Sequence, residues 1–150
     1  MKQKATYFAA QSALLILFLI VTMLQVLSFP GQIRHIREVS GISLLIEIAL
    51  TIIVGSWLLM GQIALVCMWK IVGFMKEDHF FTKESMLWIN RVVIALKTAV
   101  LFPIALFFLL IPQADDPGFF VMLTAVGTFL FTLTIFATLL RDQIRKKIEF

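Results

Sequence analysis

The sequence predicts an all-α integral membrane protein whose four transmembrane helices form an antiparallel, up-and-down bundle. Hydrophobic residues make up 61% of the 150 residues and charged residues only 15%, whereas about a quarter of a soluble domain is charged. The apolar residues are gathered into four long runs, and basic residues flank those runs. A chain of this length forms one domain at most, so we expect residues 1–150 to fold as a single four-helix transmembrane domain.

Each apolar run is long enough to cross a bilayer, because a helix advances about 1.5 Å per residue through a hydrocarbon core about 30 Å thick. The predicted spans are residues 8–29, 42–69, 88–111 and 119–140. The first span is predicted to end at Pro30 and Gly31. Its apolar run exceeds the roughly 7–15 residues of a signal-peptide core, so we interpret it as a retained helix.

The connections between spans carry local signals of their own. Between the first two spans, Ile33, Ile36 and Val39 recur every three residues, and both a short surface helix and an irregular loop fit this pattern. Thr82 is predicted to cap the third helix before it enters the membrane. Pro103 predicts a kink within that helix, because proline leaves the carbonyl of Ala99 without its usual donor.

The fourth helix is predicted to start at Asp116 and Pro117, an N-cap followed by proline at the first helical position. Beyond its apolar run, the chain ends in a basic tail.

The distribution of lysine and arginine predicts the orientation. One face would carry the two termini and the connection between the second and third spans, with ten basic residues: Lys2, Lys4, Lys70, Lys76, Lys83, Arg91, Arg141, Arg145, Lys146 and Lys147. The opposite face would carry only Arg34 and Arg37. Basic residues favour the cytoplasmic side, so both termini are predicted to be cytoplasmic.

The composition argues against several classes of function. A single cysteine, Cys67, allows neither an intramolecular disulfide nor a cysteine metal cluster, and the two histidines are too few and too far apart for an ordinary metal site. The net charge of +4 comes from residues at the ends of apolar segments, which indicates membrane topology rather than nucleic-acid binding. We therefore expect no catalytic residues, no metal and no cofactor.

Two ionisable residues fall within predicted spans, Glu47 in the second and Lys97 in the third. Such residues are costly in a membrane and are candidates for function, here as a proton- or ion-responsive pair. Structural accommodation is the alternative, with Lys97 reaching toward the inner headgroups and Glu47 protonated or beside Arg34 or Arg37. The two would lie about 10 Å apart along the helices, so we expect no direct salt bridge.

The longest polar interruption, "MKEDHFFTKESMLWINR" at residues 75–91, places Glu77, Asp78 and His79 side by side. Adjacent side chains point in different directions, whereas metal ligands are gathered at helical spacings or from separate elements. A solvated turn or a partner-docking surface fits better. The Phe80–Phe81 pair favours docking, and insertion of these rings into the inner leaflet fits the pattern equally well. The candidate docking loop comprises Lys76, Glu77, Asp78, His79, Phe80, Phe81 and Arg91, with a basic tail of Arg141, Arg145, Lys146 and Lys147.

Three short motifs give the chain a family resemblance over residues 42–147. They are Lys70-Ile71 with Phe74 after the second span, "HFFTKES" with Phe81, Thr82 and Ser85, and "ADDPGFF" before the fourth. In these the chain resembles the YoaS-like family of small four-helix bacterial membrane proteins (domain of unknown function 2975). The resemblance implies a location in the bacterial cytoplasmic (inner) membrane and no catalytic residues. It implies a membrane partner for a small cytoplasmic DNA-binding regulator of the helix-turn-helix type.

The function expected from the sequence is that of a non-enzymatic sensor or tether in the lipid bilayer, which binds such a regulator without binding DNA itself. The alternative is a small transporter or channel subunit that uses Glu47 or Lys97. Four helices can hardly enclose a pore alone, so that alternative requires a homo-oligomer.

Overall fold

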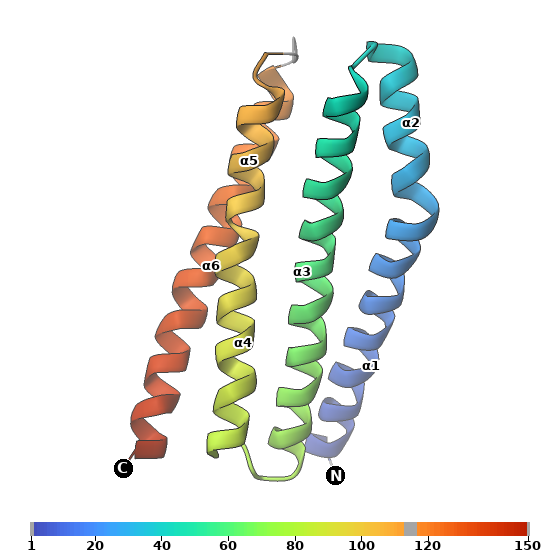
Figure 1. The fold of residues 1–150 in the computed structure, drawn as a ribbon. Helices are drawn as coiled ribbons and strands as arrows, with labels where there is room; N and C mark the ends of the chain where they lie inside the picture. Colours follow the sequence, from blue (N-terminus) through green and yellow to red (C-terminus); the bar gives the residue numbers. More distant parts are fainter. Residues whose placement is uncertain (1, 113–116, 150) are drawn as a thin grey trace.

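A computed structural model describes residues 2–112 and 117–149 of the chain. Its elements are α1 (Lys2–Met23), a π-helical turn η1 (Leu24–Ser28), α2 (Phe29–Ser40), α3 (Leu44–Lys76), α4 (Lys83–Ala99), α5 (Leu101–Leu110) and α6 (Pro117–Glu149) (Figure 1). The residues so described contain no strand, and the all-α prediction is confirmed. The cap predicted at Asp116 lies outside the described residues.

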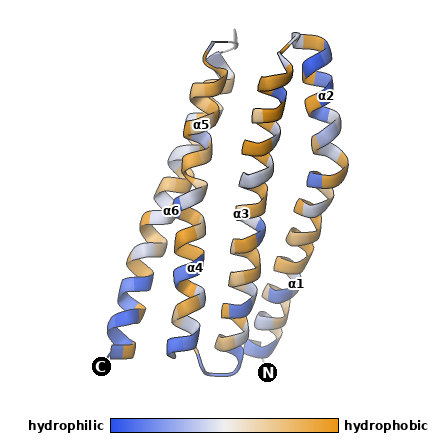
Figure 2. Ribbon diagram, in the orientation of Figure 1, coloured by the Kyte–Doolittle hydropathy of each residue, from blue (hydrophilic) through white to orange (hydrophobic). Residues whose placement is uncertain are grey.

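The elements join into four rods that are long and apolar enough to cross a membrane: Gln3–Ser40, Leu44–Lys76, Lys83–Leu110 and Pro117–Glu149. The four predicted spans are therefore confirmed. Each rod is longer than its predicted span because the helix continues into the polar flanking residues. Figure 2 shows hydrophobic residues along the middle of the rods and hydrophilic residues gathered at the end that carries both termini and on α2.

The first rod differs from the prediction, because Pro30 does not end the helix. Proline lacks an N–H group and clashes with the carbonyl four residues earlier. The π-helical turn just before it lets the Phe29 N–H bond to the Leu24 carbonyl, five residues back, and so changes the bonding pattern where the proline enters. The helix continues as α2 to Ser40 and ends at Gly41, whose φ of 60° is left-handed.

Of the periodic residues in α2, Ile33 is buried while Ile36 and Val39 are exposed. Of the two structures that fit the sequence here, a short helix and an irregular loop, the chain adopts the helix, which is continuous with the first span.

The third rod is interrupted near Pro103, as the sequence predicted. Helix α4 ends at Ala99 and α5 begins at Leu101, because the Ala99 carbonyl has no N–H donor at position 103. Pro103 is buried against α6, where a Cβ atom added to Gly127 would lie 3.5 Å from the proline Cβ. The absence of a side chain on Gly127 thus lets α6 approach α5 closely.

The four rods alternate in direction and lie side by side in the order α1–α2, α3, α4–α5, α6 (Figure 1). Helix α3 packs against α1 and α4, and α6 packs against α4 and α5. Among the described residues, α1 and α6 do not form a packed pair. The arrangement is therefore an up-and-down row with two open edges rather than a bundle closed around a central core.

Few apolar side chains are buried in this row. A small cluster of Leu50, Leu106 and Leu123 joins α3, α5 and α6, while many large side chains, such as Val26, Phe108 and Phe136, are more than 60% exposed. In a bilayer these side chains contact lipid tails, which are as apolar as leucine, so their exposure carries no hydrophobic penalty.

Candidate functional site

The turn between α3 and α4 is organised by local hydrogen bonds. The Glu77 N–H donates to the Gly73 carbonyl at 3.2 Å, and the His79 N–H donates to the Phe74 carbonyl at 2.9 Å. Asp78 has a φ of 57°, a left-handed conformation that aspartate adopts more readily than most residues. The acidic and histidine side chains are exposed, as expected of a solvated turn.

The start of α4 is held by a reciprocal cap, which confirms the prediction at Thr82. The Thr82 hydroxyl accepts from the Ser85 N–H at 3.3 Å and donates to the His79 carbonyl at 2.9 Å. The Ser85 hydroxyl accepts in return from the Thr82 N–H at 3.4 Å. Ser85 is fully buried, and its hydroxyl also reaches the carbonyls of Phe80 and Thr82. One buried serine therefore fixes the backbone on which both phenylalanines sit.

The two phenylalanines differ in exposure. Phe80 is half-buried, whereas Phe81 is 54% exposed, and their rings meet edge to face with centroids 5.1 Å apart. The ammonium Nζ of Lys147, near the end of α6, lies 5.5 Å from the centre of the Phe81 ring, within the range of a cation–π contact. The structure thus brings the candidate docking loop and the basic tail together. We call residues 76–83 together with Lys147 the turn face.

Arg91, which the sequence grouped with the docking loop, lies on α4 about two turns beyond Lys83. Its guanidinium lies 4.4 Å from the centre of the Trp88 ring. Lys70 makes a similar, longer contact of 5.8 Å with Trp69 on α3. Tryptophan and basic side chains together are typical of helix positions at the membrane–water interface, and Arg91 lies beside Trp88 on α4 rather than in the turn.

The basic tail is partly neutralised by its own acidic residues. Arg141 pairs with Asp142 at 2.7 Å, and Arg145 pairs with Glu149 at 2.9 Å. The hydrogen bond that Arg145 donates to the Glu149 carboxylate raises the pKa of the Arg145 guanidinium. Within the described part of the chain, Lys146 and Lys147 form no ion pair with an acidic residue. Of these two lysines, Lys147 is the one that lies beside Phe81.

The intramembrane candidates are not brought together. The Glu47 carboxylate, near the start of α3, forms a 3.0 Å salt bridge with Arg37 on α2. Arg37 is one of the two arginine partners that the sequence suggested. Lys97 lies on α4 and borders a groove against α6. Each residue thus has its own surroundings, and none of the ion pairs among the described residues joins Glu47 to Lys97.

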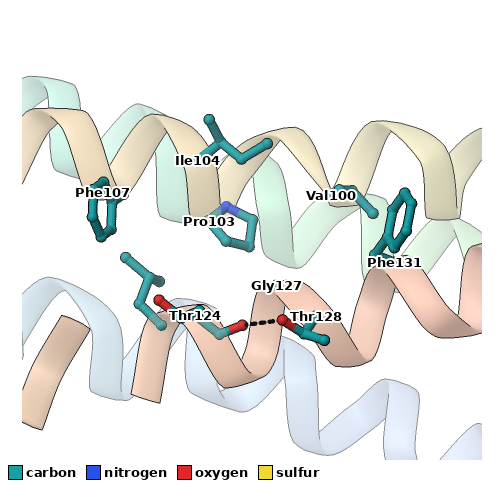
Figure 3. A pocket seen from close by; sticks show the side chains of 9 residues that line it. Val100, Pro103, Ile104, Phe107, Thr124, Gly127, Thr128 and Phe131 are labelled. Carbon is teal, nitrogen blue, oxygen red and sulfur yellow. Dashed lines mark hydrogen bonds between the residues drawn. The ribbon is translucent and has the colours of Figure 1, made fainter. Parts of the chain in front are cut away.

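A surface groove runs along the contact between α4–α5 and α6. Its larger part, of about 440 Å³, is shown in Figure 3. The lining residues are Val100, Pro103, Ile104, Phe107, Leu123, Thr124, Gly127, Thr128 and Phe131. Sequence reasoning did not find this groove, because the residues that line it are of the same apolar types as those that face lipid. Pro103 and Gly127, which shape its floor, were visible only as a helix breaker and a small residue.

The described ranges contain no group of three or more His, Cys, Asp and Glu side chains arranged to hold a metal ion. The profile of a family described as "protein of unknown function (DUF2975)" matches residues 2–149 of the chain. Comparisons with curated proteins and with solved structures give no match.

Proposed function

Because this chain belongs to the DUF2975 family, whose function is unknown, we propose a function from its surfaces: it is a sensor or tether, not an enzyme. In this proposal the turn face points into the bacterial cytoplasm and binds a cytoplasmic protein. The family resemblance suggests that this partner is a small helix-turn-helix transcription regulator, which membrane attachment would keep away from DNA.

The observation that carries the proposal is the contact between Lys147 and Phe81. The ring of Phe81 is 54% exposed at a polar turn and packs edge to face against the half-buried ring of Phe80, so the turn presents a small aromatic surface. Here it is held by the Ser85 and Thr82 bonds and has a lysine ammonium beside it. Aromatic side chains on a rigid backbone, flanked by charge, are typical of the anchors in protein–protein interfaces.

Charge supports a protein partner further. The turn face combines the exposed acidic residues Glu77 and Asp78 with the basic residues Lys76 and Lys83 at the adjoining helix ends and with Lys147 beside Phe81. A surface of mixed sign selects a partner by complementary placement of charge. It does not resemble the uniformly basic patch that binds phosphate backbones.

The test is photo-crosslinking in living cells with benzoylphenylalanine placed at Phe81. We expect a crosslinked adduct with a cytoplasmic protein. The control places the same probe at Phe108, a 70% exposed residue of the apolar α5, where we expect no such adduct. The expected adduct should also disappear when Lys147 is changed to Glu. If the probe at Phe81 captures only lipid, the ring lies in the leaflet and the docking proposal is wrong.

The transporter alternative makes a separate prediction. Glu47 is already paired with Arg37 and Lys97 lies on a different helix, so neither residue has the other as a proton or ion partner. We expect Glu47→Gln and Lys97→Met to leave proton and solute flux unchanged in proteoliposomes. A loss of flux in either variant relative to the wild type would favour transport over tethering.

A further inference from the structure

The groove in Figure 3 continues toward the end of the molecule that carries the turn face. Val100 and Phe131 border both parts of the groove. The second part has a volume of about 380 Å³ and is bordered in addition by Lys97, Thr134, Ile135, Thr138 and Leu139. The two parts form one continuous surface groove along α6. Its lining is apolar for most of its length and includes one charged residue, Lys97.

The threonine hydroxyl groups that line the groove already donate hydrogen bonds to backbone carbonyls of α6. Thr128, Thr134 and Thr138 donate to the carbonyls of Thr124, Leu130 and Thr134 at 2.8 Å each. A threonine that bonds to its own helix presents mainly its methyl group to the surroundings. The walls therefore favour an alkyl chain over a polar molecule.

Lys97 is the exception in this lining. Its side chain is exposed, and it takes part in none of the ion pairs among the described residues. Lys97 follows the interfacial Trp88 by nine residues, so its Cα lies about 13 Å deeper along the helix. A lysine at that depth is costly unless its ammonium finds a counter-charge or its long side chain reaches back to the headgroups.

We propose that this groove binds a long-chain fatty acid, with the carboxylate at the Lys97 ammonium and the alkyl chain along Pro103 and Phe107. The positive charge of Lys97 attracts an anionic group, and the apolar groove beyond it accommodates an alkyl chain. A phospholipid fits less well, because its phosphate stays at the headgroup level while Lys97 lies deeper. This inference rests on residues outside the turn face and does not depend on the proposed function.

Fluorescence of cis-parinaric acid, titrated into the full-length protein in a neutral maltoside detergent, measures the binding. We expect saturable binding that palmitate displaces. Lys97→Met should weaken the affinity at least tenfold, and Lys97→Arg, which keeps the cation, should restore most of it. Cetyl alcohol, which has the same chain without the charge, should compete poorly against the wild type.

Two further variants locate the site. Val100→Trp fills the junction of the two parts and should abolish displaceable binding, whereas Lys70→Met, beside Trp69 on α3, should bind like the wild type. Equal binding by Lys97→Met and the wild type would overturn the proposal, as would equal loss in Lys70→Met. Binding that survives Val100→Trp would also overturn it. Size-exclusion profiles identical to that of the wild type verify that each variant is folded.

The competing occupant is a second copy of this chain. In a Cys67→Ser background, Ile104→Cys places a thiol on the groove wall. We expect no disulfide-linked dimer after oxidation in native membranes. Efficient crosslinking between copies at this position would show that α5 of a neighbour covers the groove, and would overturn the fatty-acid proposal.

Discussion

Gln62 on α3 donates a hydrogen bond of 2.9 Å from its Nε2 to the hydroxyl of Thr22 on α1. Thr22 in turn donates to the Phe18 carbonyl at 2.8 Å, so the hydroxyl is both acceptor and donor. Gln62 is only 8% exposed, and both residues lie within membrane-length helices. This polar bond holds the outermost rod of the row to its neighbour, where apolar contacts alone give little preference over lipid.

Gln62→Leu should therefore weaken the packing of α1 on α3. We expect a loss of about 0.5–2 kcal/mol in the free energy of unfolding, the range for hydrogen bonds between membrane helices. Titration with sodium dodecyl sulfate in mixed micelles, followed by circular dichroism, measures this loss. Thr22→Val should cost a similar amount, and the double variant should cost little more than either one. Full additivity of the two losses would mean that the bond contributes nothing.

Ser85→Ala should be more damaging than its small change in volume suggests. The substitution leaves the Thr82 N–H without its side-chain acceptor and removes the buried donor to the Phe80 carbonyl. We expect a loss of about 1–3 kcal/mol. The matched control is Thr98→Val, also on α4, whose hydroxyl only bonds back to Ile94 and should cost much less. Equal costs in the same titration would contradict a structural role for the cap.

Glu47→Gln should loosen α2 from α3, because it removes the salt bridge to Arg37. Ile33, which is 6% exposed on α2, serves as the reporter when changed to Cys in a Cys67→Ser background. The Arg37–Glu47 pair is partly exposed, so it stabilises the packing of α2 on α3 by at most about 1 kcal/mol. We therefore expect the rate of maleimide labelling at position 33 to rise by up to about fivefold. Glu38→Gln is the control, because Glu38 takes part in none of the ion pairs in the described ranges.

Both termini and the turn face should lie in the cytoplasm, because ten basic residues mark that side and two mark the other. A green fluorescent protein fused after Phe150 should fluoresce, and alkaline phosphatase at the same position should be inactive. Alkaline phosphatase inserted at Gly41, between α2 and α3, should be active. The opposite pattern would reverse the predicted orientation and remove the turn face from the cytoplasm.

The helical spans were predictable because they depend on local composition. A run of about 20 apolar residues can satisfy its backbone in lipid only as a helix. The cap at Thr82 and the break before Pro103 were also predictable, since both depend on bonds between neighbours in the chain. The end of the first helix was predicted wrongly because proline usually stops a helix, and the π-helical turn that accommodates Pro30 has no clear sequence signal.

The sequence by itself determined that this chain forms four apolar helices with charged ends, joined by a capped turn. Only the tertiary structure decided that the helices form an open row, that Glu47 pairs with Arg37, and that Lys147 meets Phe81. The physical reason is that in a membrane the residues that face lipid and those that face another helix are equally apolar. Hydropathy therefore reveals where a helix lies in the chain but not which neighbour it packs against, and contacts between distant residues depend on that packing.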